Sequence, residues 1–235
     1  MTPAAHANTI VLILFSFFTS SSFLSAQEST IELFEDELKL WERVDGKAIG
    51  QVWELSEDGV LHLANPRGRN GSLVTKQEYG DFELTIQWRI ARGVNSGIKY
   101  RVRDFRGRML GLEYQILDSS PKKPDSHQTA AVYDLFAPNE AKWEKWSEHQ
   151  KPAMTWNETC IVVKDDRIEH WLNDKLITKA TVGSDAWKEA IAASKHSQRP
   201  TLGSDAQGRI MLTDHKGEIW FRNARLKLLA SENVK

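Results

Sequence analysis

The feature that most constrains the fold of this chain is a strict alternation of apolar and polar residues in the segment Phe82–Ile90. Every second residue of this segment is apolar, and the residues between them are Glu, Thr, Gln and Arg. A β-strand places two such sets on opposite faces of a sheet, so we expect one buried and one polar face. The segment Ile98–Arg103 alternates in the same way, which predicts a second strand with Val102 on its buried face.

Further short strands are predicted between clusters of turn residues. They are Val52–Leu55, Val60–Ala64, Leu73–Lys76, Leu112–Leu117, Thr159–Lys164, Arg167–Leu172, Lys175–Lys179, Arg209–Thr213 and Glu218–Leu228. Asp165-Asp166 and Asn173-Asp174 are the predicted hairpin turns. In the last strand the apolar residues change from odd to even positions, which predicts a β-bulge near Arg222-Asn223.

Helix is scarce in this sequence. Ser184 is placed to cap a short helix over Ala186–Ala193, and Ala141–Lys151 reads as a short surface helix or a loop. About a dozen short strands with turn signals between them are typical of a sandwich. The predicted fold class is therefore all-β, a jelly-roll sandwich of two antiparallel sheets with one or two short surface helices.

The N-terminus reads as a signal peptide. The run Ile10–Phe18 is almost wholly apolar but too short to span a bilayer, which takes about 20 apolar residues. Leu24-Ser25-Ala26 offers a small-residue cleavage site before Gln27. We therefore expect a signal peptide over 1–26 and a single domain over 27–235, exported to the periplasm or outside the cell, with no membrane span after signal removal.

Charge and motif content exclude several function classes. Lys plus Arg is 31 and Asp plus Glu is 32, so the chain has no overall basic field for a nucleic-acid partner. Cys160 is the only cysteine, which excludes an internal disulfide and a cysteine-rich zinc site. The sequence contains no Walker loop, GxGxxG, GxSxG or HExxH motif.

Two polar clusters are candidate sites. Glu113 and Gln115 share the face of their strand opposite to Tyr114, and pairing with the strand of Lys99 and Arg101 would set a carboxylate beside cations. Such a row suits a polar ligand or a developing oxyanion, but a solvated face with routine ion pairs has the same pattern.

The second cluster is Asp214-His215, with Arg222 in the return strand. His215 is suited to proton transfer near neutral pH, although a histidine at a turn is often a cap or a surface residue. His170 lies between two apolar residues on one face, which favours a hydrogen-bonded core histidine.

Retaining sandwich glycosidases use the two carboxylates of an E-x-D-x-x-E strand. This chain has instead Glu113-Tyr-Gln115-Ile-Leu-Asp118, and no Glu is followed two residues later by Asp. Asp118 joins the side of Glu113 only if the strand bulges or ends there. The pattern indicates a related groove with altered chemistry.

Several motifs together resemble those of the 3-keto-disaccharide hydrolase domain family. They are Tyr79-Gly-Asp-Phe-Glu-Leu, Asn95-Ser-Gly-Ile, Gly111-Leu-Glu-Tyr-Gln-Ile-Leu-Asp, Thr129-Ala-Ala-Val-Tyr-Asp-Leu-Phe-Ala-Pro, Trp156-Asn-Glu, Glu169-His-Trp-Leu-Asn and Ile210-Met-Leu-Thr-Asp-His followed by Phe221-Arg-Asn. The resemblance runs from about residue 32 to 229. It implies a concanavalin-like jelly roll, an exported carbohydrate-active enzyme, and cleavage of 3-keto-glycosides by elimination across C1–C2, with hydration of the resulting 2-hydroxy-glucal.

Such a reaction needs a base, a cation or donor at the C3 oxygen, and an acid at the leaving group. Our hypothesis is that Glu113 or His215 is the base and that Arg101 or Lys99 supports the enolate. The residues expected to bind hydroxyls or orient these groups are Asn95, Gln115, Asp118, Tyr133, Asp214 and Arg222. No nicotinamide is required, because a separate glycoside 3-oxidoreductase would supply the small 3-keto-saccharide. A divalent metal is compatible with the chemistry, but the sequence pattern shows no set of metal ligands.

Two other classes remain open at this point. A noncatalytic carbohydrate-binding module of the lectin or laminin G-like kind would use the same groove, with Trp or Tyr133 as a stacking platform. A passive interaction domain would bind neither sugar nor keto sugar.

Overall fold

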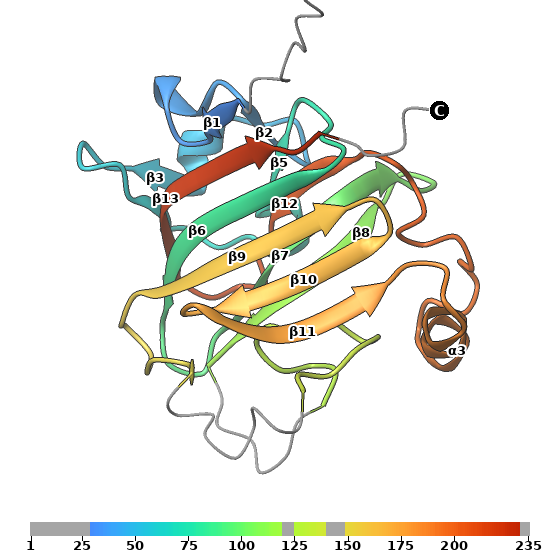
Figure 1. Cartoon of the computed structure of the whole chain (residues 1–235). Coiled ribbons are helices and arrows are strands. Elements are labelled where there is room, and N and C mark those ends of the chain that lie inside the picture. Colours follow the sequence, from blue (N-terminus) through green and yellow to red (C-terminus); the bar gives the residue numbers. More distant parts are fainter. Residues whose placement is uncertain (1–28, 119–124, 140–148, 231–235) are drawn as a thin grey trace, which may run out of the picture.

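Two antiparallel β-sheets packed face to face form the framework of the described chain (Figure 1). The computed structural model describes residues 29–118, 125–139 and 149–230. The arrangement confirms the predicted all-β jelly-roll sandwich. The predicted signal peptide 1–26 and residues 141–148 of the polar segment lie outside the described residues.

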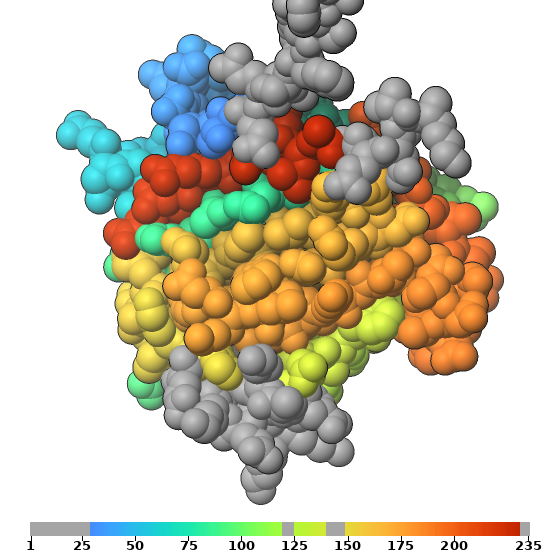
Figure 2. Space-filling model, in the orientation of Figure 1, coloured from blue at the N-terminus to red at the C-terminus, as the bar shows by residue number. Residues whose placement is uncertain are grey.

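The larger sheet has eight strands in the order β11-β10-β9-β6-β13-β4-β3, with β1 paired to β13. Their bounds are β1 Thr30–Glu32, β3 Trp53–Leu55, β4 Leu61–Leu63, β6 Phe82–Ile90, β9 Asn157–Lys164, β10 Arg167–Leu172, β11 Lys175–Thr181 and β13 Ile219–Leu228. The outer face of this sheet, toward the viewer in Figures 1 and 2, is a continuous layer in which β9 and β10 lie side by side.

The smaller sheet has five strands in the order β2-β5-β12-β7-β8. Their bounds are β2 Trp41–Arg43, β5 Leu73–Thr75, β7 Asn95–Asp104, β8 Met109–Leu117 and β12 Arg209–Leu212. The short strands β1 and β2 have no counterpart among the sequence predictions. The other predicted strands agree with the structure to within a few residues at each end.

Alternating apolar side chains build the core between the sheets. On β6 every second residue from Phe82 to Ile90 is buried, as the sequence pattern predicts. Trp41, Trp53, Trp88 and Trp187 are also buried, so these tryptophans pack the core instead of presenting a face to sugar. The expected layer separation of about 10 Å is filled by such interdigitating side chains.

His170 is a core histidine, as expected. Its Nε2 lies 2.8 Å from the Tyr100 hydroxyl and its Nδ1 3.0 Å from the Ala130 carbonyl oxygen. The carbonyl can only accept, so Nδ1 carries the proton and Nε2 accepts from Tyr100. Burial lowers the pKa of His170 to about 4, which keeps the ring neutral in the core.

The α-helix α3 (Asp185–Ala193) lies beside β11 (Figure 1). The Ser184 hydroxyl accepts a hydrogen bond from Trp187 N at 3.2 Å, which confirms the predicted N-cap. Short 3-10 turns occupy η1 Asp36–Leu38, η2 Ile49–Gln51 and η3 Gly68–Gly71. Within the described ranges no helix has the length and apolarity needed to cross a bilayer.

Two register shifts decide which side chains face outward. The pairing of β13 with β6 shifts between Arg222 and Arg225, with Asn223 at φ 51°, which confirms the predicted bulge. The pairing of β7 with β8 shifts between Tyr100 and Arg103, with Arg101 at φ 49°. The second bulge was not predicted, and it changes the composition of the outer face of the smaller sheet.

Candidate functional site

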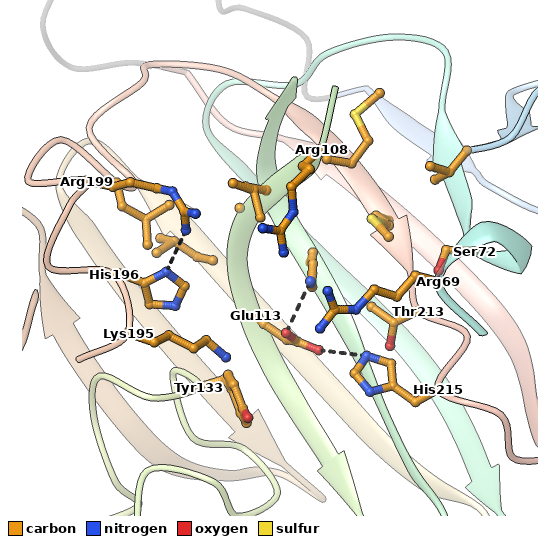
Figure 3. A pocket seen from close by; sticks show the side chains of 18 of the residues that line it. Arg69, Ser72, Arg108, Glu113, Tyr133, Lys195, His196, Arg199, Thr213 and His215 are labelled. Carbon is orange, nitrogen blue, oxygen red and sulfur yellow. Dashed lines mark hydrogen bonds and ion pairs between the residues drawn. The ribbon is translucent and has the colours of Figure 1, made fainter. Parts of the chain in front are cut away.

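A cavity of about 400 Å³ lies on the outer face of the smaller sheet (Figure 3). Its floor comes from β7, β8 and β12, and its walls come from η3, the segment after residue 132 and the loop that follows α3. The polar lining residues are Arg69, Asn70, Ser72, Lys99, Arg108, Glu113, Tyr133, Lys195, His196, Arg199, Thr213 and His215. The cavity therefore contains Glu113, His215, Lys99 and Tyr133 of the predicted site residues.

Glu113 lies at the centre of this cavity. It is opposite Lys99 in the β7–β8 register, and Lys99 Nζ is 3.5 Å from its Oε2. Its Oε1 is 3.9 Å from His215 Nε2. Oε1 is buried and has no hydrogen-bond partner among the described residues. A buried carboxylate oxygen with a free lone pair is a candidate proton acceptor.

Gly97 leaves the space that the Glu113 side chain occupies. A Cβ at position 97 would lie 2.4 Å from Glu113 Oε1 and 3.0 Å from its Cγ. The glycine of the Asn95-Ser-Gly-Ile motif therefore leaves room for the carboxylate in this position, because a Cβ at residue 97 would displace it. The sequence pattern showed the glycine but not its contact with Glu113.

His215 stands at the partly exposed side of the cavity, with 30% of its side chain accessible. Burial lowers its pKa below the ordinary value, although the charge of Glu113 opposes that effect. The ring is therefore neutral at pH 7, and it can accept a proton there.

Tyr133 and Lys195 form the opposite side. Tyr133 N donates to the Glu113 carbonyl oxygen at 2.9 Å, which sets this segment along the edge of β8. Lys195 Nζ lies 3.8 Å from the centre of the Tyr133 ring. Burial raises the pKa of Tyr133 and lowers that of Lys195, and Glu113 further raises the former. Tyr133 is thus a protonated hydroxyl beside a cation.

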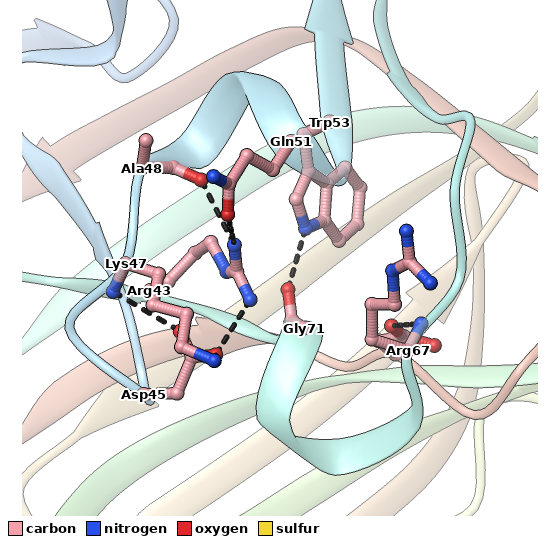
Figure 4. Close-up of polar contacts among 9 residues, drawn as sticks. Arg43, Asp45, Lys47, Ala48, Gln51, Trp53, Arg67 and Gly71 are labelled. Atoms are coloured by element: carbon pink, nitrogen blue, oxygen red, sulfur yellow. Dashed lines mark hydrogen bonds and ion pairs between the residues drawn. The ribbon is translucent and has the colours of Figure 1, made fainter.

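Arg69 enters the cavity from the η3 turn, whose position is fixed by contacts around it (Figure 4). Trp53 Nε1 donates to Gly71 O at 2.7 Å, and Asp214 Oδ2 accepts from Arg67 N at 2.6 Å. Asp214 is fully buried and also accepts from Lys216 N at 2.8 Å. Asp214 was expected to bind hydroxyls or to orient the reacting groups; its contacts orient the η3 turn and the segment that carries His215.

Arg101 does not reach the cavity, so its predicted place beside Lys99 is wrong. The bulge at its positive φ turns the side chain away, and its guanidinium donates to Gly203 O and Asp165 O, each at 2.6 Å. The same bulge turns Val102 to the outer face, where it packs with Val74 and Met211. The expected buried position of Val102 between the sheets is therefore also wrong.

Asn95, Gln115 and Asp118 lie outside the lining of this cavity. Gln115 Nε2 donates to Asn95 Oδ1 at 3.1 Å, and the segment at Ala130 and Ala131 pairs with the Gln115 backbone. Asp118 Oδ2 accepts from Gly93 N at 2.7 Å, which closes the loop between β6 and β7. Their contacts are with the backbone and with one another, outside the cavity, and the expectation that they bind hydroxyls or orient the reacting groups stays a prediction.

Arg222 is on the other sheet. Its Nε donates to Gln87 Oε1 at 2.8 Å, and its guanidinium lies 4.2 Å from the centre of a Trp156 ring. Phe221 before it points into the core, so the strand turns Arg222 outward, away from the cavity. Its predicted proximity to His215 followed from sequence order and is wrong.

Sequence reasoning missed Arg69, Arg108, Lys195, His196 and Arg199. All lie in loops or beside turns, where no periodicity shows the direction of a side chain. The basic run Lys195-His-Ser-Gln-Arg199 was the visible signal, but nothing in it indicates that the loop folds back over β8. Across the described ranges, no three His, Cys, Asp or Glu side chains gather as a metal-ligand set.

Comparison with known proteins points to carbohydrate chemistry. The profile of a family described as 3-keto-alpha-glucoside-1,2-lyase-like domain matches residues 29–227. A protein of Bacteroides thetaiotaomicron named 3-keto-disaccharide hydrolase is 27% identical over 223 residues, covering 80% of this chain and 74% of that protein.

Two crystal structures of proteins from Parabacteroides distasonis, both provisionally named glycosyl hydrolases, share the fold. The first is 25% identical with a TM-score of 0.72, covering 86% of this chain and 94% of its own. The second is 22% identical with a TM-score of 0.61, covering 86% of this chain and all of its own.

Proposed function

This chain belongs to the 3-keto-alpha-glucoside-1,2-lyase-like family, and from that membership we propose that it cleaves 3-keto-glycosides by elimination at C1–C2. A carbohydrate-active hydrolase-like role follows from the family and from the named relative. The observation that carries the finer proposal is the buried, unpartnered Oε1 of Glu113 in a cavity lined with cations.

The reaction depends on the ketone. A carbonyl at C3 acidifies the C2 proton, because its removal gives a resonance-stabilised enolate. Collapse of the enolate expels the oxygen substituent at C1 and leaves a C1–C2 double bond, that is, a 3-keto-2-hydroxy-glucal. Addition of water across this bond would complete a net hydrolysis, in keeping with the name of the relative.

In this proposal Glu113 removes the C2 proton. Lys99, 3.5 Å from Oε2, pairs with that oxygen of the carboxylate and leaves Oε1 available. The carboxylate is buried on the sheet, so few waters compete for the lone pair. A rigid strand also holds the base better than a loop would.

Arg69 and Lys195 are the proposed partners of the enolate oxygen. In Figure 3 both side chains point toward Glu113 from opposite sides of the cavity. A cation aimed at the oxygen where charge develops stabilises the transition state more than the ground state. They take the role that the sequence analysis had assigned to Arg101 or Lys99.

His215 is the proposed proton relay to the leaving oxygen. Its Nε2 faces Glu113 Oε1 at 3.9 Å, and its neutral ring can take up the proton and pass it on. The C2 proton would thus leave with the C1 substituent, which balances the elimination. Export and supply of substrate by a glycoside 3-oxidoreductase remain parts of the same proposal.

Incubation with 3-keto-trehalose, 3-keto-sucrose and the unoxidised sugars, with and without chelator, tests the function. We expect mass detection of a keto-glucal or 3-keto-glucose from the keto sugars alone. Saturable binding of the unoxidised sugars without turnover of any keto sugar would contradict the enzyme and favour a carbohydrate-binding module.

The pH dependence tests the relay. Because burial lowers the pKa of His215, its neutral form persists below the ordinary value of 6.5 and is lost only at lower pH. We expect kcat to fall on the acid side with an apparent pKa below 6.5, and His215→Gln to remove that part of the profile while lowering kcat about 10- to 100-fold. Stopped-assay pH profiles of both proteins measure this. An acid limb that His215→Gln leaves unchanged would contradict the proposal that His215 relays the proton.

A further inference from the structure

We propose that the substrate of this cavity carries an anionic group, a carboxylate or a phosphate, bound by Arg108 and Arg199. This inference specifies the substrate class and rests on the proposed 3-keto-glycoside chemistry. It concerns the part of the cavity formed by the β7–β8 hairpin and the loop after α3.

The charges that line the cavity are unbalanced. Among its described lining residues one is a carboxylate, Glu113, and five are basic side chains: Arg69, Lys99, Arg108, Lys195 and Arg199. Glu113 is ion-paired with Lys99. No ion pair joins Arg69, Arg108 or Arg199 to a carboxylate within the described ranges. The whole chain has a net charge of −1, so this excess is local.

Arg199 is held in place without a carboxylate. Its Nη1 donates to His196 Nδ1 at 3.3 Å, and its guanidinium lies 5.3 Å from the centre of the Phe105 ring. Its Nε is buried and has no acceptor among the described residues. Burial lowers the pKa of His196 to about 4, so the imidazole stays neutral and adds no competing charge at neutral pH.

Arg108 approaches from a different element. It follows the tight turn of the β7–β8 hairpin, where Arg106 and Gly107 have positive φ and Phe105 exchanges two backbone hydrogen bonds with Arg108. In Figure 3 its guanidinium points into the cavity between Arg199 and Arg69. Two arginines from separate elements thus face one space.

Their chemistry selects an acceptor. A sugar hydroxyl both donates and accepts, whereas a guanidinium only donates. Carboxylate and phosphate oxygens only accept, and they match the planar fork of arginine. Leu110, Leu135 and Leu202 also line the cavity, and an apolar surrounding strengthens such a charge-assisted contact.

Matched 3-keto substrates test the inference. The pairs are the phenyl glucoside against the 4-hydroxybenzoate glucoside, the phenyl glucoside against its 4-phosphate, and the methyl glucoside against the methyl glucuronide. We expect the wild type to show at least a tenfold higher kcat/KM for the acid in one pair or more. Arg108→Gln and Arg199→Gln should each lower that acid-to-neutral ratio about tenfold. Arg106→Gln on the same hairpin, outside the lining residues, should keep the ratio.

Equal kcat/KM within every pair, or ratios that the two substitutions leave intact, would overturn the inference. If no 3-keto substrate reacts, the proposed function fails, and the anion site is judged by calorimetry with the unoxidised pairs. Tighter binding of an acid, weakened by salt and by Arg108→Gln, supports the site; equal affinity within every pair overturns it.

Discussion

Replacing Glu113 with Gln should lower kcat on a 3-keto-glycoside by about 10²- to 10⁴-fold, the usual effect of removing a general base. Gln has nearly the same shape, so the side chain can stay over Gly97 while its amide oxygen still accepts from Lys99. KM should change little, because the substituted group acts on the C2 proton and not on binding. Initial rates and single-turnover kinetics measure both.

A second readout isolates the proton step. In D₂O the wild type should incorporate deuterium at C2 of the keto sugar if the enolate returns, and Glu113→Gln should not. The matched control is Glu42→Gln; this glutamate of β2 is ion-paired with Arg209 of β12 and lies outside the cavity. Near wild-type kcat and C2 exchange in Glu113→Gln would show that the base is another group.

Replacing Gly97 with Ala should lower kcat about 10²-fold without touching any reacting group. The new Cβ would lie 2.4 Å from Glu113 Oε1, so the carboxylate must move by an ångström or more. Displacement of a catalytic group on that scale costs about 10² in rate. Rates, with circular dichroism and a melting temperature to establish folding, measure the effect.

The control and the rescue separate displacement from misfolding. Gly50→Ala adds a Cβ with nothing within 4 Å and should leave kcat within about twofold. Glu113→Asp shortens the side chain that meets the new Cβ, so the double variant should lose less activity than the product of the two single losses. Strict multiplicativity, or full activity of Gly97→Ala, would show that Gly97 does not position the base.

The pairing of Lys99 with Glu113 could be anticipated because each lies in a strand with clear alternation. Once the two strands are neighbours, the pleat places both side chains on the outer face, and the structure has them directly opposite. The core position of His170 and the bulge near Arg222-Asn223 could be predicted for the same reason. Each of these predictions depends only on the alternation within a few consecutive residues.

Arg101 shows the limit of that reasoning. Alternation assigned it to the face of Lys99, but the bulge between Tyr100 and Arg103 interrupts the pleat. A non-glycine residue at φ 49° is unfavourable by itself and is kept by its surroundings, here the carbonyl groups of Gly203 and Asp165. Those carbonyl groups are distant from Arg101 in sequence, so no local sequence pattern predicts the bulge.

The sequence by itself determined the two-sheet sandwich, its buried faces and the outward direction of Glu113 and Lys99, because side-chain alternation along a strand is a local property. Only the tertiary structure decided that Arg69, Lys195 and Arg199 surround that carboxylate and that Gly97 makes room for it. Loops have no period that fixes the direction of their side chains, and their positions follow from contacts such as those of Asp214 with the η3 turn, made between residues more than a hundred positions apart.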